Sequence, residues 1–321
     1  MISLVTGATG FLGSRLARRL AERGDRVRVL ARPTSDRRRI AGLDVEIRTG
    51  DITDRSSVEA ALDGAEAVYH VAALYELGTP DPARMETINV GGTRNVLEAA
   101  ARRAIPAVHV SSVVALGPSG PAPVGESHWR AETPRSAYEA TKRAAHEIAR
   151  ELARGGASVR IALPVTIYGP DDPSLVGRFH AHFLRGHIPV GALADMTMSL
   201  VHVDDCAAGL VRIAEAGHNG EEYILCGDAV TFRRWIEALA RVAGRAAPRV
   251  WLPDWLLRGT APFARLAAPV AGLSSSLVRE GMAMAEDVHW SFSAEKARRD
   301  LAWTSRSLED GLRTVVAFHR R

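Results

Sequence analysis

The chain of 321 residues is 46% hydrophobic and 24% charged, a composition typical of a globular enzyme built as one large domain or as a domain with a smaller lobe. The net charge is +4 and the isoelectric point about 9.4, but basic residues alternate with acids, as in residues 294–300, so we expect no nucleic-acid partner. Cys206 and Cys226 stand in unrelated contexts, which predicts reduced, packed thiols and no metal site.

The first half of the chain alternates between short apolar strands and amphipathic helices. Met1 leads directly into the first strand without a basic and apolar leader, and we therefore expect a cytoplasmic protein. Ser136 and Glu139 form a capping pattern at the start of one helix. The expected strands are 2–6, 26–31, 45–51, 66–73, 106–113 and 158–169, and the expected helices are 10–24, 56–64, 82–104 and 136–154.

The rhythm of strands and helices loosens after residue 170. Residues 198–203 and 221–227 resemble strands that return to the sheet or lie at its edge, and helices are expected at 204–216, 231–243 and 308–320. The apolar tract 252–273 is broken by arginines and prolines, so it predicts a lobe helix or a pocket lid, with an interfacial membrane helix as the alternative. No apolar run is long enough to span a membrane.

Strands that alternate with helices predict parallel strands joined by right-handed crossovers. The expected fold is α/β, with a Rossmann-type doubly wound parallel sheet and a smaller C-terminal α/β substrate lobe. We assign residues 1–169 to a nucleotide-binding domain, to which the chain returns near 198–227, and residues 170–321 mainly to a substrate-binding lobe.

The stretch VTGATGFLGS at residues 5–14 carries Gly7, Gly10 and Gly13 between the first strand and the first helix. The first glycine permits a tight turn, the second lets the backbone approach a ligand, and the third lets the helix pack closely on the strand. The helix N-terminus then directs free N–H groups at a phosphate. This context predicts a dinucleotide pyrophosphate site.

Arg32 follows the second strand, where an acid would accept hydrogen bonds from the adenosine ribose of NAD. An arginine suits the 2′-phosphate of NADP, so we favour NADP, with NAD as the less favoured alternative. The three arginines at 37–39 follow in the same loop, and they equally fit an ordinary run of solvated side chains. Asp51 ends the third strand and can accept from the adenine amino group, while Asp54 is the better cap for the following helix.

Tyr138 and Lys142 lie four residues apart on one predicted helix and therefore share a face. A tyrosine hydroxyl can give a proton to a carbonyl oxygen or take one from an alcohol, and a nearby ammonium is expected to lower the pKa of the phenol. Ser112 ends a strand at the carboxyl edge of the sheet and can hold the substrate oxygen.

Eight motifs together resemble those of the extended short-chain dehydrogenases/reductases, the NAD-dependent epimerase/dehydratase superfamily. Within it the chain is most similar to the dihydroflavonol-reductase-like branch, which includes bacterial proteins labelled hopanoid-associated sugar epimerases. The motifs occur in the order of the family: TGATGFLG (6–13), GDITD (50–54), HVAA (70–73), NVGGTRNVLEAA (89–100), SSV (111–113), YEATK (138–142), PVTIYGP (164–170) and HVDD (202–205).

The resemblance implies a role for each matching residue. Ser112 and Tyr138 are expected to be catalytic, and Lys142 is expected to orient the nicotinamide ribose and tune the tyrosine. Asn89 is expected to bond backbone in a structural role. The residues expected to contact the cofactor elsewhere are Gly7, Thr9, Gly10, Phe11, Leu12 and Gly13 at the pyrophosphate, Asp51 and Ile52 at adenine, Ala72 along the cofactor, and Pro164 near the nicotinamide.

Three reaction classes remain open. Family dehydratases carry an Asp-Glu pair where Val113 and Val114 follow Ser112, which argues against dehydration. We expect reduction of a ketone or aldehyde, or oxidation of the alcohol. The alternatives are a nucleotide-sugar epimerase that retains its cofactor and a non-catalytic NADP-binding regulator. Candidates for the diphosphate site of an epimerase are Arg178, Arg185, Arg212 and Arg233, each of which equally fits a solvated helix face.

The substrate pocket is expected to be apolar, which favours a hydrophobic carbonyl compound. For Val113 and Ile167 an ordinary core position is a reasonable alternative. The candidates for its lining are Leu74, Tyr75, Leu77, Val113, Val114, Ile167, Tyr168, Met196 and Met198, of which Tyr75, Val113, Tyr168 and Met198 are our substrate assignments.

The resemblance also implies a homodimer. The helices 82–104 and 136–154 resemble those that pair into a four-helix interface in the family. Ala140, Ala144 and Ala145 would allow close packing of the second helix.

Overall fold

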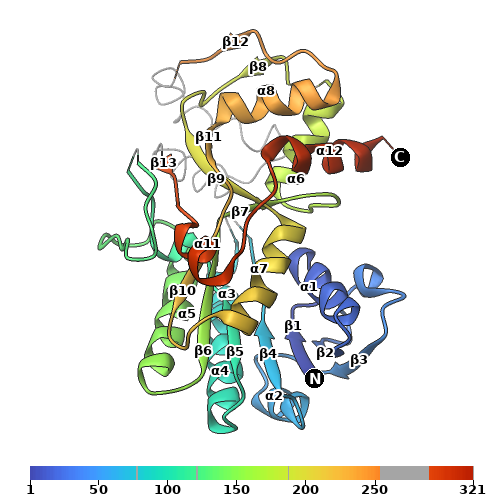
Figure 1. The fold of residues 1–321 in the computed structure, drawn as a ribbon, viewed down its shortest axis with the longest axis vertical. Coiled ribbons are helices and arrows are strands. Elements are labelled where there is room, and N and C mark those ends of the chain that lie inside the picture. The colour runs from blue at the N-terminus through green and yellow to red at the C-terminus, as the bar shows by residue number, and fades with distance from the viewer. Residues whose placement is uncertain (77–78, 121, 187, 254–288, 321) are drawn as a thin grey trace.

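The apolar strands form a seven-stranded parallel sheet in the order β10-β6-β5-β4-β1-β2-β3 (Figure 1). The computed structural model describes residues 1–76, 79–120, 122–186, 188–253 and 289–320. This sheet confirms the doubly wound α/β fold. Its strands are β1 (Ile2–Thr6), β2 (Arg26–Ala31), β3 (Val45–Thr49), β4 (Ala67–His70), β5 (Ala107–Val110), β6 (Val159–Pro164) and β10 (Glu222–Leu225).

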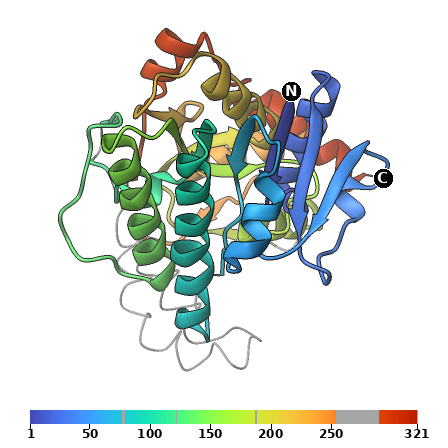
Figure 2. The ribbon, with the colours of Figure 1, turned by 90° about the horizontal axis from the view of Figure 1, so that it is seen from below.

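Helices cover both faces of the sheet because each crossover between parallel strands must pack an apolar helix face. On one face α1 (Phe11–Glu22) packs against α7 (Val203–Ala216). On the other face α2 (Arg55–Leu62) contacts α4 (Gly92–Arg102), which lies beside α5 (Ala137–Arg154) (Figure 2). The Ser136 hydroxyl accepts from the Glu139 N–H at the start of α5, which confirms the predicted cap.

The helix expected at 82–104 is present but is not regular throughout. It consists of α3 (Pro82–Glu86), a π-helical turn at Thr87–Gly91 and α4. A Cβ on Gly92 would approach the Ile52 Cδ1 to 2.5 Å. This glycine therefore lets α4 lie close to the loop that follows β3.

The C-terminal part builds a smaller sheet beyond the carboxyl edge of the main one (Figure 1). It also contains a short parallel pair, β8 (Val190–Gly191) with β12 (Val250–Trp251), and α11 (Glu295–Leu301), which contacts α7. The smaller sheet contains β7 (Thr166–Tyr168), β9 (Thr197–His202), β11 (Ala229–Thr231) and β13 (His289–Trp290), and it is accompanied by α6 (Leu175–Leu184), α8 (Phe232–Ala243) and α12 (Leu308–His319).

The two strands expected to return to the main sheet have different partners. β10 pairs with β6 at the edge of the main sheet, whereas β9 pairs with β7, β11 and β13 in the smaller sheet. The expectation that residues 198–203 rejoin the main sheet is therefore wrong. The apolar pattern of a strand indicates burial but does not identify the strand beside which it lies.

Candidate active site

The glycine turn between β1 and α1 is shaped by close backbone contacts. Gly7 has a φ of +74°, and a Cβ there would lie 2.7 Å from the Ala72 backbone. A Cβ on Gly13 would lie 2.1 Å from the Gly7 carbonyl oxygen. α1 begins after Gly10 with no side-chain cap, so its first N–H groups remain available to an anion. This backbone fits the pyrophosphate of a dinucleotide.

The side chains of the turn contribute unequally to this cradle. Thr9 and Phe11 are half-buried, whereas Leu12 is 8% exposed and lies in the core. Leu12 can therefore contact a pyrophosphate only through its main chain.

Four arginines follow the carboxyl end of β2, at positions 32 and 37–39, and two of them are already paired. Arg38 binds Asp36 at 2.6 Å, and Arg39 binds Asp171 at 2.7 Å. Arg32 is exposed and forms no ion pair with any residue that the structure describes. Arg32 is therefore available to a phosphate at the adenosine end of a cofactor.

The loop after β3 has two acids with different roles. Asp54 caps α2 by accepting from the Ser56 and Ser57 N–H groups, as expected. Asp51 accepts from the Thr53 N–H and hydroxyl, each at 2.9 Å, through the same carboxylate oxygen. Ile52 is 7% exposed, so its side chain supports the loop from within the core.

Ser112, Tyr138 and Lys142 come together at the carboxyl end of β5. The Ser112 hydroxyl accepts from the Val114 N–H at 3.2 Å, and it lies close enough to Tyr138 to act on the pKa of the phenol. One turn along α5, the Lys142 Nζ donates to the Val110 carbonyl oxygen at 2.9 Å. Pro164 ends β6, the strand next to β5. The structure thus assembles the three expected catalytic side chains around one strand end.

The electrostatics of the tyrosine differ from the expectation. Burial raises the pKa of Tyr138, and the Ser112 hydroxyl opposes this shift only in part. Burial also lowers the pKa of Lys142 to about 8. The expected lowering of the tyrosine pKa by Lys142 is wrong for the protein alone, because desolvation disfavours both charged forms. Tyr138 is consequently protonated at neutral pH and can serve as a proton donor.

The loop after β4 approaches Tyr138. Asn89 is 2% exposed, and its Oδ1 accepts from the Leu74 N–H at 2.6 Å while its Nδ2 donates to the Leu74 carbonyl at 3.0 Å. Its Nδ2 also lies 3.1 Å from the Thr141 hydroxyl of α5. Tyr75, which follows Leu74 in the loop, contacts Tyr138 edge-to-face at a ring-centroid distance of 4.9 Å. Asn89 thus bonds main-chain groups as expected, but these groups belong to the loop after β4 and not to its own helix.

The four substrate assignments occupy different environments. Tyr75 is 51% exposed beside Tyr138, and Met198 is half-buried on β9. Val113 and Tyr168 lie in the two hydrophobic cores with 4% and 2% exposure, which corrects their assignment to a pocket wall. Leu77 lies outside the described residues.

One buried residue of this site escaped the sequence reasoning. His146 lies one turn after Lys142 on α5, and its Nδ1 is 2.9 Å from the Ser111 hydroxyl. The available signal was its spacing, which continues the stripe of Tyr138 and Lys142 on the same helix face.

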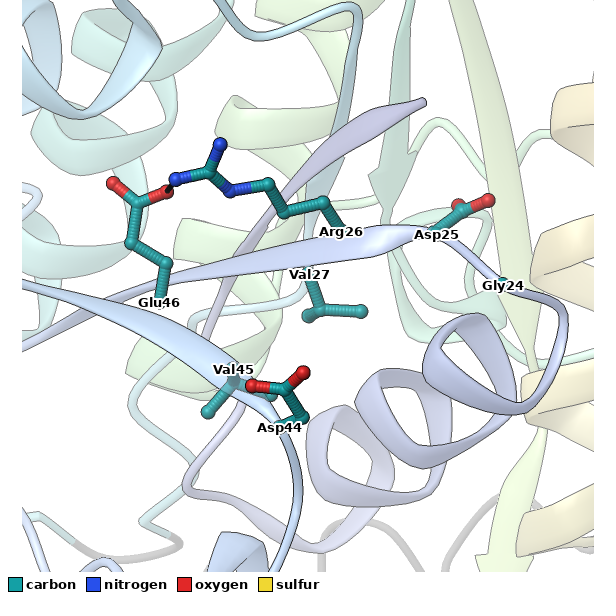
Figure 3. A pocket seen from close by; sticks show the side chains of 7 residues that line it. All are labelled: Gly24, Asp25, Arg26, Val27, Asp44, Val45 and Glu46. Carbon is teal, nitrogen blue, oxygen red and sulfur yellow. Dashed lines mark ion pairs between the residues drawn. The ribbon is translucent and has the colours of Figure 1, made fainter.

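A polar hollow of about 450 Å³ lies at the opposite, amino end of β2 and β3 (Figure 3). Its lining includes Asp25, Asp44 and the ion pair of Arg26 with Glu46, whose charged atoms are 3.1 Å apart. Ligands of open parallel sheets bind at the carboxyl ends of the strands. We therefore do not assign this hollow to the catalytic site.

Among the described residues, none of the helices has the length and apolar character needed to cross a membrane. The tract 252–273 lies outside the described residues except for Leu252 and Pro253.

The family model described as "NAD dependent epimerase/dehydratase family" matches residues 3–226. The chain belongs to this family. It is therefore an NAD(P)-dependent enzyme of the extended short-chain dehydrogenase/reductase type, as the motifs predicted.

Curated relatives within the epimerase/dehydratase family include several proteins named as reductases. The chain is 36% identical to sterol demethylase protein B of Methylococcus capsulatus over 81% of this chain and 80% of the relative. It is 30% identical to a Synechocystis protein named as a dihydroflavonol 4-reductase, over 97% and 92%. It is 32% identical to ceramide reductase of Caulobacter vibrioides, over 78% and 73%.

Solved structures of the same architecture cover the chain almost completely. The crystal structure of gox2253 is 35% identical, with a TM-score of 0.87, and covers 99% of this chain and 98% of its own. PA4631 of Pseudomonas aeruginosa, titled a nucleoside-diphosphate-sugar epimerase, is 26% identical with a TM-score of 0.80, over 100% and 97%. The relatives thus include both reductase and epimerase names.

Proposed function

We propose that this enzyme reduces a ketone or aldehyde on an apolar substrate with NADPH, or oxidises the corresponding alcohol. The observation that carries the proposal is the placement of Tyr138 beside Ser112 at the carboxyl end of β5, where burial raises the pKa of the phenol. A neutral phenol beside a second hydroxyl is suited to bind a carbonyl oxygen and to donate a proton to it.

The protein side chains have separate roles in this reaction. Ser112 donates a hydrogen bond that fixes the carbonyl oxygen, and Tyr138 transfers its proton to that oxygen as the alcohol forms. Lys142 binds the nicotinamide ribose and supplies positive charge beside the tyrosine. A bound nicotinamide cofactor supplies the hydride that reduces the carbonyl carbon.

The preference for NADP rests on Arg32. Its guanidinium follows β2 and has no ion-pair partner among the described residues, unlike Arg38 and Arg39. A 2′-phosphate can accept charge-assisted hydrogen bonds from such a side chain.

The apolar substrate class rests on Tyr75 and on the names of the relatives. Tyr75 presents a 51% exposed aromatic ring next to Tyr138. Sterols and ceramides, which occur in the names of two relatives, are apolar compounds.

The direct test measures oxidation of NADPH with ketones and aldehydes of increasing chain length. We expect turnover that improves with chain length, and Tyr138→Phe should lower kcat by about 10²–10⁴-fold because the proton donor is lost. Tyr223→Phe is the matched control, because it removes a buried tyrosine hydroxyl that accepts from the His218 N–H and has no role in the proposed reaction. Tight binding of NADPH without turnover of any carbonyl would favour the regulator alternative.

The nucleotide-sugar epimerase remains the second candidate because PA4631 carries that title. Two of its four candidate arginines are engaged, since Arg212 donates to the Leu301 carbonyl and Arg233 lies over the Trp251 ring at 4.5 Å. The other two, Arg178 and Arg185, are exposed. A cofactor that purifies with the protein and does not exchange, together with specific binding of a sugar nucleotide, would favour the epimerase.

A further inference from the structure

His146 is a buried imidazole that the proposed reaction does not use. It lies on α5, and its side chain has no exposed surface. Its Nδ1 is 2.9 Å from the Ser111 hydroxyl at the end of β5. Its Nε2 is 3.4 Å from the Glu222 carboxylate on the edge strand β10. The imidazole is therefore hydrogen-bonded to a hydroxyl at the end of β5, while its other nitrogen faces a carboxylate two strands away without a hydrogen bond.

The carboxylate determines the tautomer of this imidazole. Burial disfavours the charged form of Glu222, but His146 and the Arg150 guanidinium together hold its pKa at about 2. Glu222 is thus an ionised acceptor, which favours a proton on the facing Nε2. In this tautomer Nδ1 is the acceptor of the 2.9 Å hydrogen bond from the Ser111 hydroxyl.

Ser111 lies between the two positions of the strand that serve the reaction. Ser112 follows it and lies beside Tyr138, while Val110 precedes it and accepts from the Lys142 Nζ. The Ser111 N–H also donates to the Ala162 carbonyl of β6 at 2.9 Å. The hydrogen bond from its side chain to His146 restrains Ser111 at a second point, in addition to the main-chain bond.

We propose that His146 is a positioning residue for carbonyl reduction. By accepting the Ser111 hydroxyl, it fixes the strand end that presents Ser112 to the substrate and the Val110 carbonyl to Lys142. This inference rests on the proposed function. Catalytic groups held by hydrogen bonds lose rate steeply when they shift, because the reacting geometry is precise.

The experiment compares His146→Leu with His146→Asn. Leucine removes the acceptor, whereas the Asn Oδ1 can take the place of Nδ1. We expect His146→Leu to lower kcat 10- to 100-fold with KM changed less than threefold, and His146→Asn to retain kcat within fivefold. Ser111→Ala should resemble His146→Leu, and the double variant should be no slower than either single variant, because both remove the same bond.

A structural role alone predicts a different pattern. Ile148→Ala is the control, since Ile148 is buried on the same helix at 5% exposure and its truncation should lower the melting temperature without changing kcat. A folded His146→Leu enzyme with full kcat would overturn the inference, as would effects of Ser111→Ala and His146→Leu that multiply.

Ser111→Ala decides the question alone if His146→Leu does not fold, because full kcat in that variant would also contradict the inference. A wild-type enzyme that turns over no carbonyl would overturn the proposed function and this inference with it. Wild-type turnover that both variants leave unchanged would overturn only the inference.

Discussion

Burial shifts the side chains of Tyr138 and Lys142, to which we assign the proposed reaction, toward their neutral forms. It raises the pKa of Tyr138 and lowers the pKa of Lys142 to about 8. The tyrosine is thereby kept as an acid, while the lysine retains most of its charge only below about pH 8. Burial therefore favours the protonated tyrosine that the proposed reaction needs, but it disfavours the charged lysine that the reaction also needs.

The lowered pKa of Lys142 predicts a measurable pH dependence of stability. Between pH 8 and 10 the unfolded chain holds a proton on this lysine that the folded protein has released, so stability rises with pH. The gain from this group is about 2 kcal/mol over that range. Urea unfolding at pH 8 and pH 10 without cofactor should show this difference relative to Lys142→Met. An equal pH response in both proteins would contradict the assignment.

Arg32 should determine the choice of cofactor. Loss of its charge-assisted hydrogen bonds, worth about 1.5–3 kcal/mol, should weaken binding of NADPH by about 10- to 100-fold in Arg32→Ala and leave binding of NADH unchanged. Both affinities can be measured by titrating the protein with each cofactor and following the fluorescence of the bound nicotinamide. Arg38→Ala is the control, because that side chain is paired with Asp36. Equal binding of NADPH and NADH by the wild type would contradict the role of Arg32 in binding the 2′-phosphate.

At the scale of elements, the site depends on segments held against one another by buried polar side chains. Asn89 in the π-helical turn bonds both backbone groups of Leu74, and so connects the loop after β4 with the helices. This loop brings Tyr75 to Tyr138. A single amide thus holds the loop that carries Tyr75 next to Tyr138.

Replacement of Asn89 by alanine should lower the free energy of unfolding by about 2–4 kcal/mol, because buried partners lose their hydrogen bonds. It should also reduce kcat/KM, since Tyr75 is released. Chemical denaturation and steady-state kinetics measure the two effects. Asn219→Ala, at an exposed turn, should change stability by less than about 0.5 kcal/mol. A stable Asn89→Ala protein with unchanged kinetics would contradict this role.

At the scale of the whole molecule, α4 and α5 lie side by side on one face of the sheet (Figure 2). Ala140 is exposed on α5 and Ala144 is half-buried, but Ala145 is only 1% exposed. The expectation that Ala145 contributes to an outer face is therefore wrong, because its side of the helix packs inward. We propose that Ala140 and Ala144 belong to a homodimer interface.

Sedimentation velocity at micromolar concentration should then show a dimer. Ala140→Arg should convert it to a monomer, because a charged side chain would replace a small one in a closely packed interface. Ala317→Arg is the control, since Ala317 is an exposed alanine of α12. A wild-type monomer at that concentration would remove the proposal.

The sequence by itself determined the doubly wound sheet, most helix limits, the cap at Ser136 and the grouping of Ser112, Tyr138 and Lys142. These features depend on local patterns: apolar periodicity, glycine at tight turns, and spacing along one helix. The motifs also identified the NAD-dependent epimerase/dehydratase family.

Only the tertiary structure decided that β9 joins the smaller sheet, that Val113 and Tyr168 lie in the cores, and that His146 meets Ser111. Each of these depends on contacts between segments far apart in the chain, which a local pattern does not specify. The ionisation of Tyr138 depends on burial for the same reason: desolvation is set by everything packed around a group, and not by its neighbours in sequence.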